Sequence, residues 1–367
     1  MKSKNLNIIF LDFDDIKNPL LSAGQARATV EVGKRLARKG HKITVICSRY
    51  PGSADRIENG LRYKHIGLGS GNVRLNNLVY ILTLPFTVMR LKGDIIFEFF
   101  TAPISTLFSP LFTNIPVIAV PTSFEAERFA KLYHLPVDKI ESFGLRFYKY
   151  FIPYTSHLDQ KMRRVNPKVV SRIVPEGVGS EFFNIKKKKT THILFLGRFD
   201  VGQKGIDLLI KSFARCCSDI KLPLVIAGVG PDKDKIQNLI EKYNLTDKIK
   251  FMGPAYGKEK EELLSKAQYV AFPSRHEGFS LFALEALAAG LPLVSFDIPS
   301  LEWADQRSVS KAKKFDIGQY SKNMIKLADK KVASKMAKEA RKLARKYTWE
   351  NVANKYEQFS FDILKGI

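Results

Sequence analysis

Cysteine is scarce: the sequence of 367 residues holds three cysteines, too few for a disulfide framework. They are Cys47, Cys216 and Cys217, and none of them belongs to a CxxC pair. An odd and sparse count is typical of proteins kept in a reducing compartment, so we expect a cytoplasmic location. The six histidines form no HxxH or HExxH pattern and no cysteine joins them, so no metal site is expected.

Long apolar runs are also lacking. The longest apolar window, from Leu78 to Met89, is too short to cross a bilayer as a helix and contains Pro85. The apolar run near the start of the chain is interrupted at Asp12, so it predicts a first buried strand and not an export signal. We therefore expect a protein without a membrane span.

Acidic residues are few compared with basic ones. The sequence has 36 Asp and Glu against 60 Lys and Arg, which gives a net charge of +24. The excess is spread over both halves of the chain and is not held in a tail. Such a charge favours an anionic partner: a nucleic acid, a phosphorylated substrate or an acidic membrane surface.

Two stretches combine apolar or aromatic side chains with basic ones, and both are candidates for contact with a membrane surface. One is 78–92. The other, 143–154, has the sequence FGLRFYKYFIPY and sets Arg146 and Lys149 among aromatic residues. Burial in the core is the alternative for both stretches. Together with the net charge, they favour peripheral contact with an anionic membrane.

Apolar strands alternate with helices along the whole chain, a pattern typical of a parallel sheet covered on both faces. In the first half the pattern predicts a helix at 25–40. It predicts strands at 6–11, 42–47, 94–99, 115–120 and 170–174. The inner face of the predicted helix holds Ala28, Val32 and Leu36, and Gly40 ends it.

The second half restarts the pattern after the basic run 186–189. Strands are predicted at 191–197, 222–228, 248–253, 269–273 and 292–296, with helices at 206–217, 234–244, 260–267 and 281–289. We therefore expect an α/β protein of two Rossmann-like, doubly wound parallel-sheet domains facing a cleft. The first domain is expected at 1–172 and the second at 173–348.

The stretch from Pro273 to Gly290, PSRHEGFSLFALEALAAG, places two carboxylates around a helix start. Ser280 is the expected N-cap of a helix that begins at Leu281. The free N–H groups at 279–282 would form an anion site at the carboxyl edge of the sheet. Glu285, about one turn inside the helix, is placed to accept hydrogen bonds from a sugar diol. Glu277, in the loop, would face the transferred group.

The alternative for Glu285 is a pair with a lysine or exposure to solvent, and for Glu277 it is a plain loop charge.

A second loop, GRFDVGQKG at 197–205, follows a predicted strand and opens the next helix. Its glycines allow the backbone to turn. Arg198 can grip phosphate through two hydrogen bonds, and Lys204 adds a compact positive charge. Both cations would reach the same edge of the sheet as the helix that begins at Leu281. The alternative is a pair of surface cations on an ordinary turn.

These segments resemble a known family. In their order, GRFDVGQKGIDLLIKSF, VIAGVGPDKDKI, FMGP and PSRHEGFSLFALEALAAGLPLV are similar to the C-terminal domain of the family 4 retaining glycosyltransferases of GT-B fold. EGFSLFALE matches their E-x7-E motif, with Glu277 first and Glu285 second. In the rest of the chain, SAGQARATVEVGKRLARKGHKITVIC and VPEGV resemble family segments. TWENVANKYEQF is similar to the final helix, which would return 349–367 to the N-terminal domain.

The resemblance implies a nucleotide-sugar donor in the C-terminal domain and an acceptor, a glycan or a lipid-phosphate carrier, in the N-terminal domain. Glu277, Arg198 and Lys204 would be catalytic. The other donor-binding residues would be Glu285, Phe279, Ser280, Leu281, Gly197 and Gly253, and the acceptor-binding residues Ala23, Gly24 and Gln25. Transfer would retain the anomeric configuration without a metal ion or cofactor, leaving UDP or GDP as product.

Two other interpretations of the function remain. A nucleotide-sugar epimerase could use the same scaffold, and a nucleic-acid-binding protein is suggested by charge alone. Asp12-Phe13-Asp14 is a literal DxD, but it follows a first strand, which favours a structural or acceptor-side role. Gly228-Val229-Gly230 lacks the third glycine of a dinucleotide fingerprint, since Lys233 stands there, so NAD is not expected.

Overall fold

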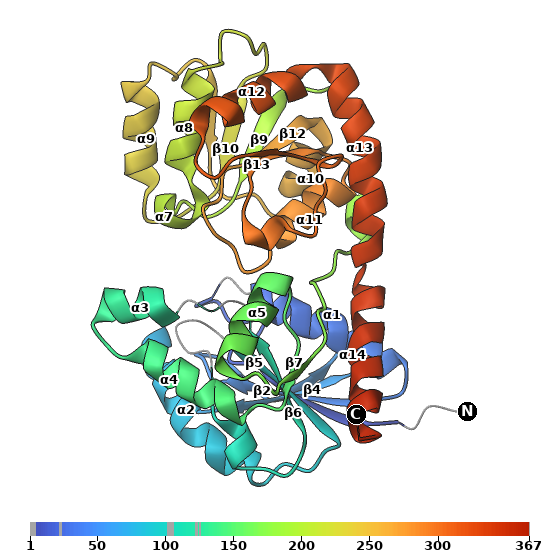
Figure 1. Ribbon diagram of the computed structural model, residues 1–367. Helices are drawn as coiled ribbons and strands as arrows, with labels where there is room; N and C mark the ends of the chain where they lie inside the picture. Colours follow the sequence, from blue (N-terminus) through green and yellow to red (C-terminus); the bar gives the residue numbers. More distant parts are fainter. Residues whose placement is uncertain (1–4, 22–23, 101–105, 122–123, 125, 367) are drawn as a thin grey trace. The chain divides into compact units, whose positions relative to one another are not determined.

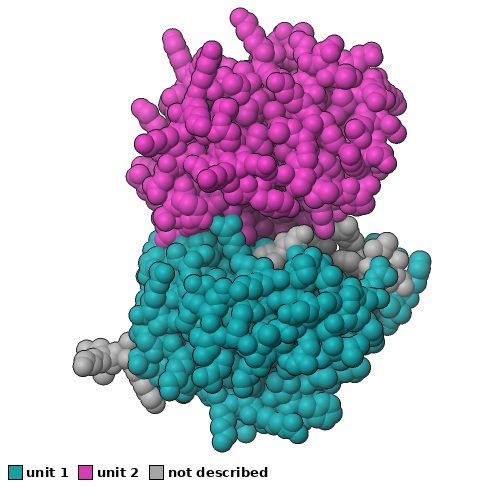
Figure 2. Space-filling model, turned by 180° about the vertical axis from the view of Figure 1, so that it is seen from behind, with its two compact units in different colours: residues 1–176, 349–367 teal, residues 177–348 magenta. Residues whose placement is uncertain are grey.

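The computed structural model describes residues 5–21, 24–100, 106–121, 124 and 126–366 (Figure 1). The chain divides into two compact units, coloured separately in Figure 2. Unit 1 holds residues 1–176 and 349–367, and unit 2 holds 177–348. The expected boundary at 172/173 lies four residues before the boundary between these units.

Unit 1 is built on an eight-stranded sheet in the order β3-β4-β2-β1-β5-β6-β7-β8. The strands are β1 (Asn7–Leu11), β2 (Lys42–Ser48), β3 (Arg56–Glu58), β4 (Leu61–Ile66), β5 (Ile95–Phe100), β6 (Val117–Pro121), β7 (Tyr150–Phe151) and β8 (Val170–Ser171). All neighbours pair in parallel except β3, which is antiparallel to β4. Every residue of β5 and β6 is buried, as expected for strands covered on both faces.

Helices cover both faces of this sheet (Figure 1). They are α1 (Gly24–Arg38), α2 (Val73–Val88), α3 (Ala126–Tyr133), α4 (Val137–Gly144), α5 (Ser156–Val165) and α14 (Trp349–Leu364), with the short 3-10 helices η1 (Ser109–Leu111) and η2 (Leu145–Phe147). In α1, the expected inner residues Ala28, Val32 and Leu36 are buried. The helix ends before Gly40, whose φ of 98° is left-handed.

The last helix of the chain completes unit 1, as the resemblance implied. Helix α14 packs against α1. Glu357 of α14 accepts hydrogen bonds from Lys39 Nζ at 2.5 Å and lies 3.0 Å from His41 Nε2. The Tyr356 ring lies 4.9 Å from the ring of Phe97 on β5. Residues more than 250 positions apart therefore share one core.

Unit 2 has a six-stranded, fully parallel sheet in the order β11-β10-β9-β12-β13-β14. The strands are β9 (His192–Leu196), β10 (Leu224–Ala227), β11 (Ile249–Met252), β12 (Ala267–Phe272), β13 (Leu293–Phe296) and β14 (Val309–Ala312). The expected strands are confirmed, and β14 was not expected. The chain runs outward from β9 to β11 and then returns to β12 on the other side of β9.

This reversal decides which face each helix covers, because crossovers between parallel strands are right-handed. The helices are α6 (Ser180–Phe183), α7 (Val201–Lys204), α8 (Ile206–Ala214), α9 (Lys233–Lys242), α10 (Gly257–Lys266), α11 (Leu281–Ala288), α12 (Ile317–Ala328) and α13 (Lys330–Ala344), with η3 (Pro299–Leu301) and η4 (Arg345–Tyr347). Helix α8 contacts α9 and α12, while α11 contacts α13. Unit 2 is therefore a doubly wound, three-layered domain, as expected.

The two stretches considered for membrane contact have mixed environments. In 143–154, Tyr148 and Phe151 are fully buried, whereas Phe143 is 57% exposed. In 78–92, Tyr80 is fully buried and Phe86 is 62% exposed. Each stretch therefore contributes to the core and to the surface. In the part of the chain that the structure describes, no helix has the length and apolar character needed to cross a bilayer.

One ionisable side chain lies at the centre of the core of unit 1. Glu98 on β5 has no exposed surface, and its carboxyl accepts hydrogen bonds from Ser109 Oγ and from the Tyr148 hydroxyl, each at 2.9 Å. Burial raises the pKa of Glu98 to about 8, against the opposing effect of these two hydrogen bonds. The carboxyl group is therefore protonated in the folded protein at neutral pH.

We expect Glu98→Gln to stabilise the protein in alkaline solution. Because the folded-state pKa lies above the unfolded value, the wild type loses stability as pH rises toward 8, whereas glutamine does not titrate. Relative to the wild type, the variant should gain roughly 2 kcal/mol between pH 6 and pH 9. Thermal unfolding at both pH values measures this. An equal difference in Tm at the two pH values would contradict it.

Candidate functional site

The expected donor residues lie where the sheet of unit 2 reverses its strand order. Strand β9 pairs with β10 on one side and with β12 on the other. The segments that leave the carboxyl ends of β9 and β12, 197–205 and 273–280, therefore start side by side. In open parallel sheets, ligands bind at the carboxyl ends of the strands at such a switch point.

Glycine allows these segments to pack closely. Gly205 has a φ of 65°, and a Cβ there would clash with the carbonyl oxygen of Pro273. Gly228, which follows β10, has a φ of 154°, and a Cβ there would clash with the carbonyl oxygen of Gly197. The backbones that follow three neighbouring strands are thus in contact, which leaves no room for larger residues.

Arg275 joins the two segments. Its guanidinium donates two hydrogen bonds to the Asp207 carboxylate, at 2.7 and 2.8 Å, and a third to the Val201 carbonyl at 2.7 Å. Its backbone N–H donates to the Gln203 carbonyl at 2.8 Å. Burial alone would raise the pKa of Asp207, but the hydrogen bonds and charge of Arg275 lower it below the usual value. Arg275 therefore fixes the segment 201–207 to the segment after β12.

The structure brings Lys204 and Glu277 together. Lys204 Nζ lies 2.7 Å from Glu277 Oε1, and Ser274 Oγ donates to the same oxygen at 2.7 Å. The Glu277 side chain is 6% exposed and that of Lys204 is 21% exposed. Glu277 is therefore not a plain loop charge: it is a nearly buried carboxylate held by a cation from the neighbouring segment.

Glu285 lies inside α11 and is also paired. Lys260 Nζ of α10 lies 2.5 Å from Glu285 Oε2, with side-chain exposures of 19% and 6%. The Lys260 ammonium also lies 5.1 Å from the Phe182 ring. The lysine pair considered as an alternative for Glu285 is thus present. It fixes a carboxylate at a nearly buried position of α11.

Arg198 does not join either pair. Its guanidinium donates to Gln203 Oε1 at 2.5 Å and to Asp200 Oδ2 at 3.2 Å, both in its own loop. The side chain is 59% exposed. Arg198 is therefore an accessible cation at the carboxyl edge of the sheet, held by hydrogen bonds within its own loop.

The remaining donor candidates surround the start of α11. Ser280 is the N-cap, as expected, and its Oγ accepts from the Ala283 N–H at 3.3 Å. Leu281 is the first helical residue. The Phe279 ring stacks on Trp303 with 5.2 Å between ring centroids. These contacts fix the helix start that would receive an anion.

Gly197 and Gly253 are tied into the same edge by their backbones. The Gly197 N–H donates to the Ala227 carbonyl at 3.1 Å, and the Gly253 carbonyl accepts from the Gly228 N–H at 3.1 Å. A Cβ at Gly253 would meet nothing within 4 Å, so this backbone is open to an approaching group.

The acceptor candidates belong to unit 1. Gly24 begins α1, and Gln25 Oε1 accepts from the Tyr154 hydroxyl at 3.2 Å. Ala23 lies outside the described residues. The segment that carries these positions leaves β1, and β1 pairs with β2 on one side and β5 on the other. Like the donor candidates, they therefore follow a strand at a switch point.

The DxD carboxyls are tied into the protein. Asp12 Oδ2 accepts from Thr29 Oγ1 at 2.5 Å, and burial raises the pKa of Asp12 to about 7. Burial and the charge of Asp12 raise the pKa of Asp14 to about 8. Within the described ranges, no group of three or more metal-ligating side chains is found.

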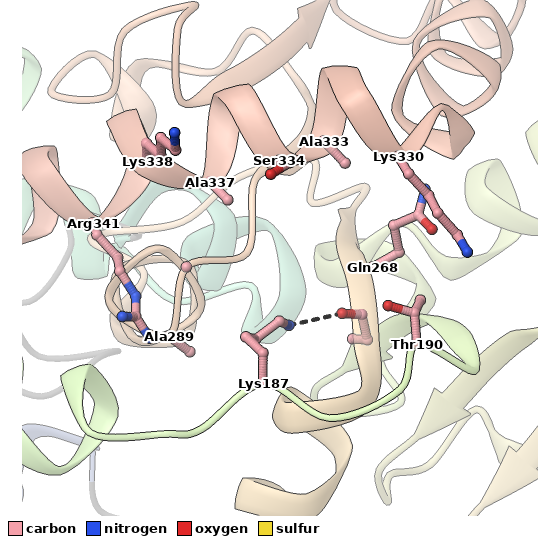
Figure 3. A pocket seen from close by; sticks show the side chains of 12 residues that line it. Lys187, Thr190, Gln268, Ala289, Lys330, Ala333, Ser334, Ala337, Lys338 and Arg341 are labelled. Atoms are coloured by element: carbon pink, nitrogen blue, oxygen red, sulfur yellow. Dashed lines mark hydrogen bonds between the residues drawn. The ribbon is translucent and has the colours of Figure 1, made fainter.

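A cavity elsewhere in unit 2 does not involve the candidate site (Figure 3). It has a volume of about 350 Å³, and its lining includes Lys187, Gln268 and Arg341. Lys187 Nζ donates to the Leu264 and Ala267 carbonyls, and burial lowers its pKa to about 8. Because Ala267 and Gln268 begin β12, this cavity lies at the amino end of that strand, away from the switch-point segments.

The sequence did not single out Arg275 or Lys260. Arg275 stands inside the motif stretch, two residues before Glu277, and an arginine there could have been tested as a partner for Asp207. Lys260 is one of several charged residues on an exposed helix, KEKEELLSK, and no local signal marks it. Its role follows only from the packing of α10 beside α11.

We expect Arg275→Ala to destabilise unit 2, because it removes two hydrogen bonds from the Asp207 carboxylate and one from the Val201 carbonyl. The loss should be roughly 2 kcal/mol, seen as a lower Tm. Arg275→Lys should recover little of it, since an ammonium cannot make the paired hydrogen bonds. Arg307→Ala is a matched control: Arg307 also contacts an aspartate, Asp305, at 2.7 Å, but is 71% exposed. Equal losses from Arg275→Ala and Arg307→Ala would refute the assigned role.

Known proteins resemble the chain in sequence. It is 27% identical to the phosphatidylinositol N-acetylglucosaminyltransferase gpi3 subunit of Schizosaccharomyces pombe, over 72% of this chain and 61% of that protein. It is 35% identical to the N-acetylgalactosamine-N,N'-diacetylbacillosaminyl-diphospho-undecaprenol 4-alpha-N-acetylgalactosaminyltransferase of Campylobacter jejuni, over 33% of this chain and 32% of that protein. The chain therefore spans less than two thirds of the length of either relative.

The solved structures confirm the expected fold. The sucrose-phosphate synthase of Thermosynechococcus elongatus superposes with a TM-score of 0.79 over 98% of this chain and 100% of that chain, at 18% identity. A family model described as Glycosyltransferase Family 4 matches residues 22–181, and one described as Glycosyl transferases group 1 matches residues 180–345. Because the two models follow each other over both units, the chain belongs to the family 4 glycosyltransferases, with the GT-B fold.

Proposed function

We propose that this protein transfers a sugar from a nucleoside-diphosphate sugar to a glycan or lipid-linked acceptor, with retention of the anomeric configuration and without a metal ion. The observation that carries the proposal is the arrangement at the switch point of unit 2. There, Lys204 holds Glu277, Lys260 holds Glu285, and Arg198 stands exposed at the same sheet edge.

The diphosphate is proposed to bind at the N-terminus of α11. Helix N-termini attract anions through their unpaired N–H groups. Arg198 can exchange its neutral partner Gln203 for a phosphate, a stronger acceptor for guanidinium. Lys204 adds its charge from the neighbouring segment. Two cations and a helix N-terminus together can neutralise a departing diphosphate, which is the role a metal would otherwise fill.

The two carboxylates are proposed to bind the sugar groups of the donor. Glu285 is fixed by Lys260 and can accept hydrogen bonds from the two hydroxyls of a ribose. Glu277 lies in the segment before the helix start and is fixed by Lys204 and Ser274, so it can contact the transferred sugar. Positioned, nearly buried carboxylates discriminate well between ligands with and without hydroxyl groups.

Transfer breaks the bond between the anomeric carbon and the diphosphate oxygen. A new bond then forms from the acceptor oxygen on the same face of the sugar. The proton of the acceptor hydroxyl can pass to the departing phosphate oxygen. The sequence from Val120 to Phe124 contains no histidine, so no imidazole base is proposed there.

A lipid-linked acceptor is supported by the names of the two relatives. One is a phosphatidylinositol N-acetylglucosaminyltransferase subunit, and the name of the other contains diphospho-undecaprenol. The acceptor is proposed to bind in unit 1 near Gly24 and Gln25, with Ala23 beside them in sequence. The loop that carries these residues leaves a switch point of its own sheet.

Arg198→Ala should lower the rate of sugar transfer by about 10²-fold or more, because it removes a cation from the leaving diphosphate. The side chain is 59% exposed, so the Tm should hardly change.

The donor is first identified by thermal shift with a panel of UDP- and GDP-sugars. Release of the nucleoside diphosphate is then measured with and without excess EDTA, and EDTA should have no effect. Arg215→Ala, another exposed arginine of unit 2, is the control. A full rate in Arg198→Ala would defeat the assignment.

Glu285→Gln should weaken donor binding by about tenfold while the fold persists, since a neutral amide accepts hydroxyl hydrogen bonds less strongly than a carboxylate. Calorimetric titration measures the affinity for the identified donor and for its free nucleobase. The affinity for the nucleobase should not change, because Glu285 is proposed to contact the ribose. Glu302→Gln, a substitution of the same chemistry outside α11, is the control. Unchanged donor affinity in Glu285→Gln would contradict ribose binding by this residue.

A further inference from the structure

Helix α2 carries a stripe of apolar side chains on its outer face. Leu75, Leu78, Leu82, Phe86 and Met89 are 39%, 54%, 61%, 62% and 55% exposed. They are spaced by three or four residues, which places them along one side of the helix. The stripe runs from the first turn of α2 to the residue that caps its end.

The opposite face of α2 already supplies the core contacts. Asn76, Tyr80, Leu84 and Val88, spaced by four residues, are all buried in unit 1. Helices of soluble proteins normally place charged residues opposite such a face, yet no charged residue occurs from Leu75 to Met89. A contiguous exposed apolar surface of this kind marks a site of interaction.

The apolar surface extends beyond α2. Helix α2 contacts η1, whose Leu111 is 52% exposed. Phe108, which precedes η1, lies 6.3 Å from the ring of Phe143 on α4. Phe143 and Ile140 of α4 are 57% and 48% exposed. The labels in Figure 1 locate α2 and α4 in the same part of unit 1. The stripe of α2 together with Leu111, Ile140 and Phe143 is named the docking face.

Basic residues border the docking face. Arg90 and Lys92 are exposed just after α2. On α4 and just after it, Lys139 and Arg146 line a hollow of about 280 Å³ together with Asp138, Ser142 and Phe143. No Asp or Glu occurs in the sequence between Glu58 and Asp94. The border of the docking face is therefore mainly positive, despite Asp138.

We propose that the docking face binds the surface of an anionic lipid bilayer. A helix that lies in the interface needs apolar side chains to enter the acyl boundary and cations to meet the headgroups, and the docking face offers both. A second copy of the chain would place like charges opposite each other, which disfavours self-association through this face. With 16 residues and an internal Pro85, α2 lies along the bilayer and does not cross it.

The inner side of α2 packs against the segment after β1. Tyr80, on the inner side of α2, packs edge-on against Phe13 with 5.5 Å between ring centroids, and its hydroxyl donates to the Ile46 carbonyl. Phe13 belongs to the segment that leads to Gly24 and Gln25. A bilayer bound to the outer face of α2 would thus lie on the helix whose inner face packs against the segment leading to the proposed acceptor residues. None of the proposed donor residues belongs to the docking face, so the two proposals can fail separately.

The test is co-sedimentation of the purified protein with vesicles of phosphatidylcholine alone and with 3:7 mixtures of phosphatidylglycerol and phosphatidylcholine. The wild type should bind the mixed vesicles, and binding should weaken with added salt. Leu82→Ser with Phe86→Ser should lower the affinity by about tenfold or more, since it removes apolar area from the bilayer contact. Arg90→Ala with Lys92→Ala should also lower it, by roughly 30-fold for the two charges.

The controls remove the same kinds of side chain elsewhere. Ile57→Ser with Ile325→Ser removes two exposed apolar residues, 71% and 38% exposed, and Lys242→Ala with Lys335→Ala removes two exposed cations. Neither control should alter vesicle binding, and thermal unfolding checks that every variant folds. Absence of binding by the wild type would overturn the proposal. So would equal binding to neutral vesicles, or a dimer in light scattering that Leu82→Ser with Phe86→Ser disperses. Donor binding, measured in parallel without vesicles, reports on the proposed function alone.

Discussion

The reversal of strand order between β9 and β12 is the constraint on which the candidate site depends. Because both strands are parallel and adjacent, the segments that leave them must turn away at the same edge of the sheet. Side chains about 70 positions apart therefore come into contact, as Lys204 does with Glu277 and Arg275 with Asp207. Gly205 has a left-handed backbone and no Cβ, so the two segments can approach each other closely at this edge.

The charges at this edge are largely balanced before any ligand binds. Each of the two nearly buried carboxylates is paired with one lysine. Neither carboxylate is therefore an unpaired negative charge with little contact to solvent. Arg198 is an exposed cation in the loop that also carries Lys204. An anionic ligand would then be attracted mainly by Arg198 and by the N-terminus of α11. Lys204 can help only by sharing its charge between Glu277 and the ligand.

Much of the fold and part of the site could be predicted from the sequence, where a local pattern was enough. Ser280 was recognisable as an N-cap from its place before an apolar helix. The hairpin of β3 and β4 was missed, although Asn59-Gly60 between them is a turn signal and both residues have positive φ. The two-residue strands β7 and β8 carry too few residues for any periodicity. The lysine that pairs with Glu285 follows from the packing of two helices, which no local pattern encodes.

Helix α2 shows why the sequence left two interpretations of 78–92 open. Its inner face has the apolar spacing of a core helix, and its outer face has a second apolar spacing shifted around the helix axis. A periodicity argument cannot separate two apolar faces, because together they make a continuous apolar run. The inner face supplies the core contacts of unit 1, while the outer face leaves apolar side chains exposed to water. A bilayer that covers the outer face would remove this apolar area from water, which is the physical basis of the proposed membrane contact.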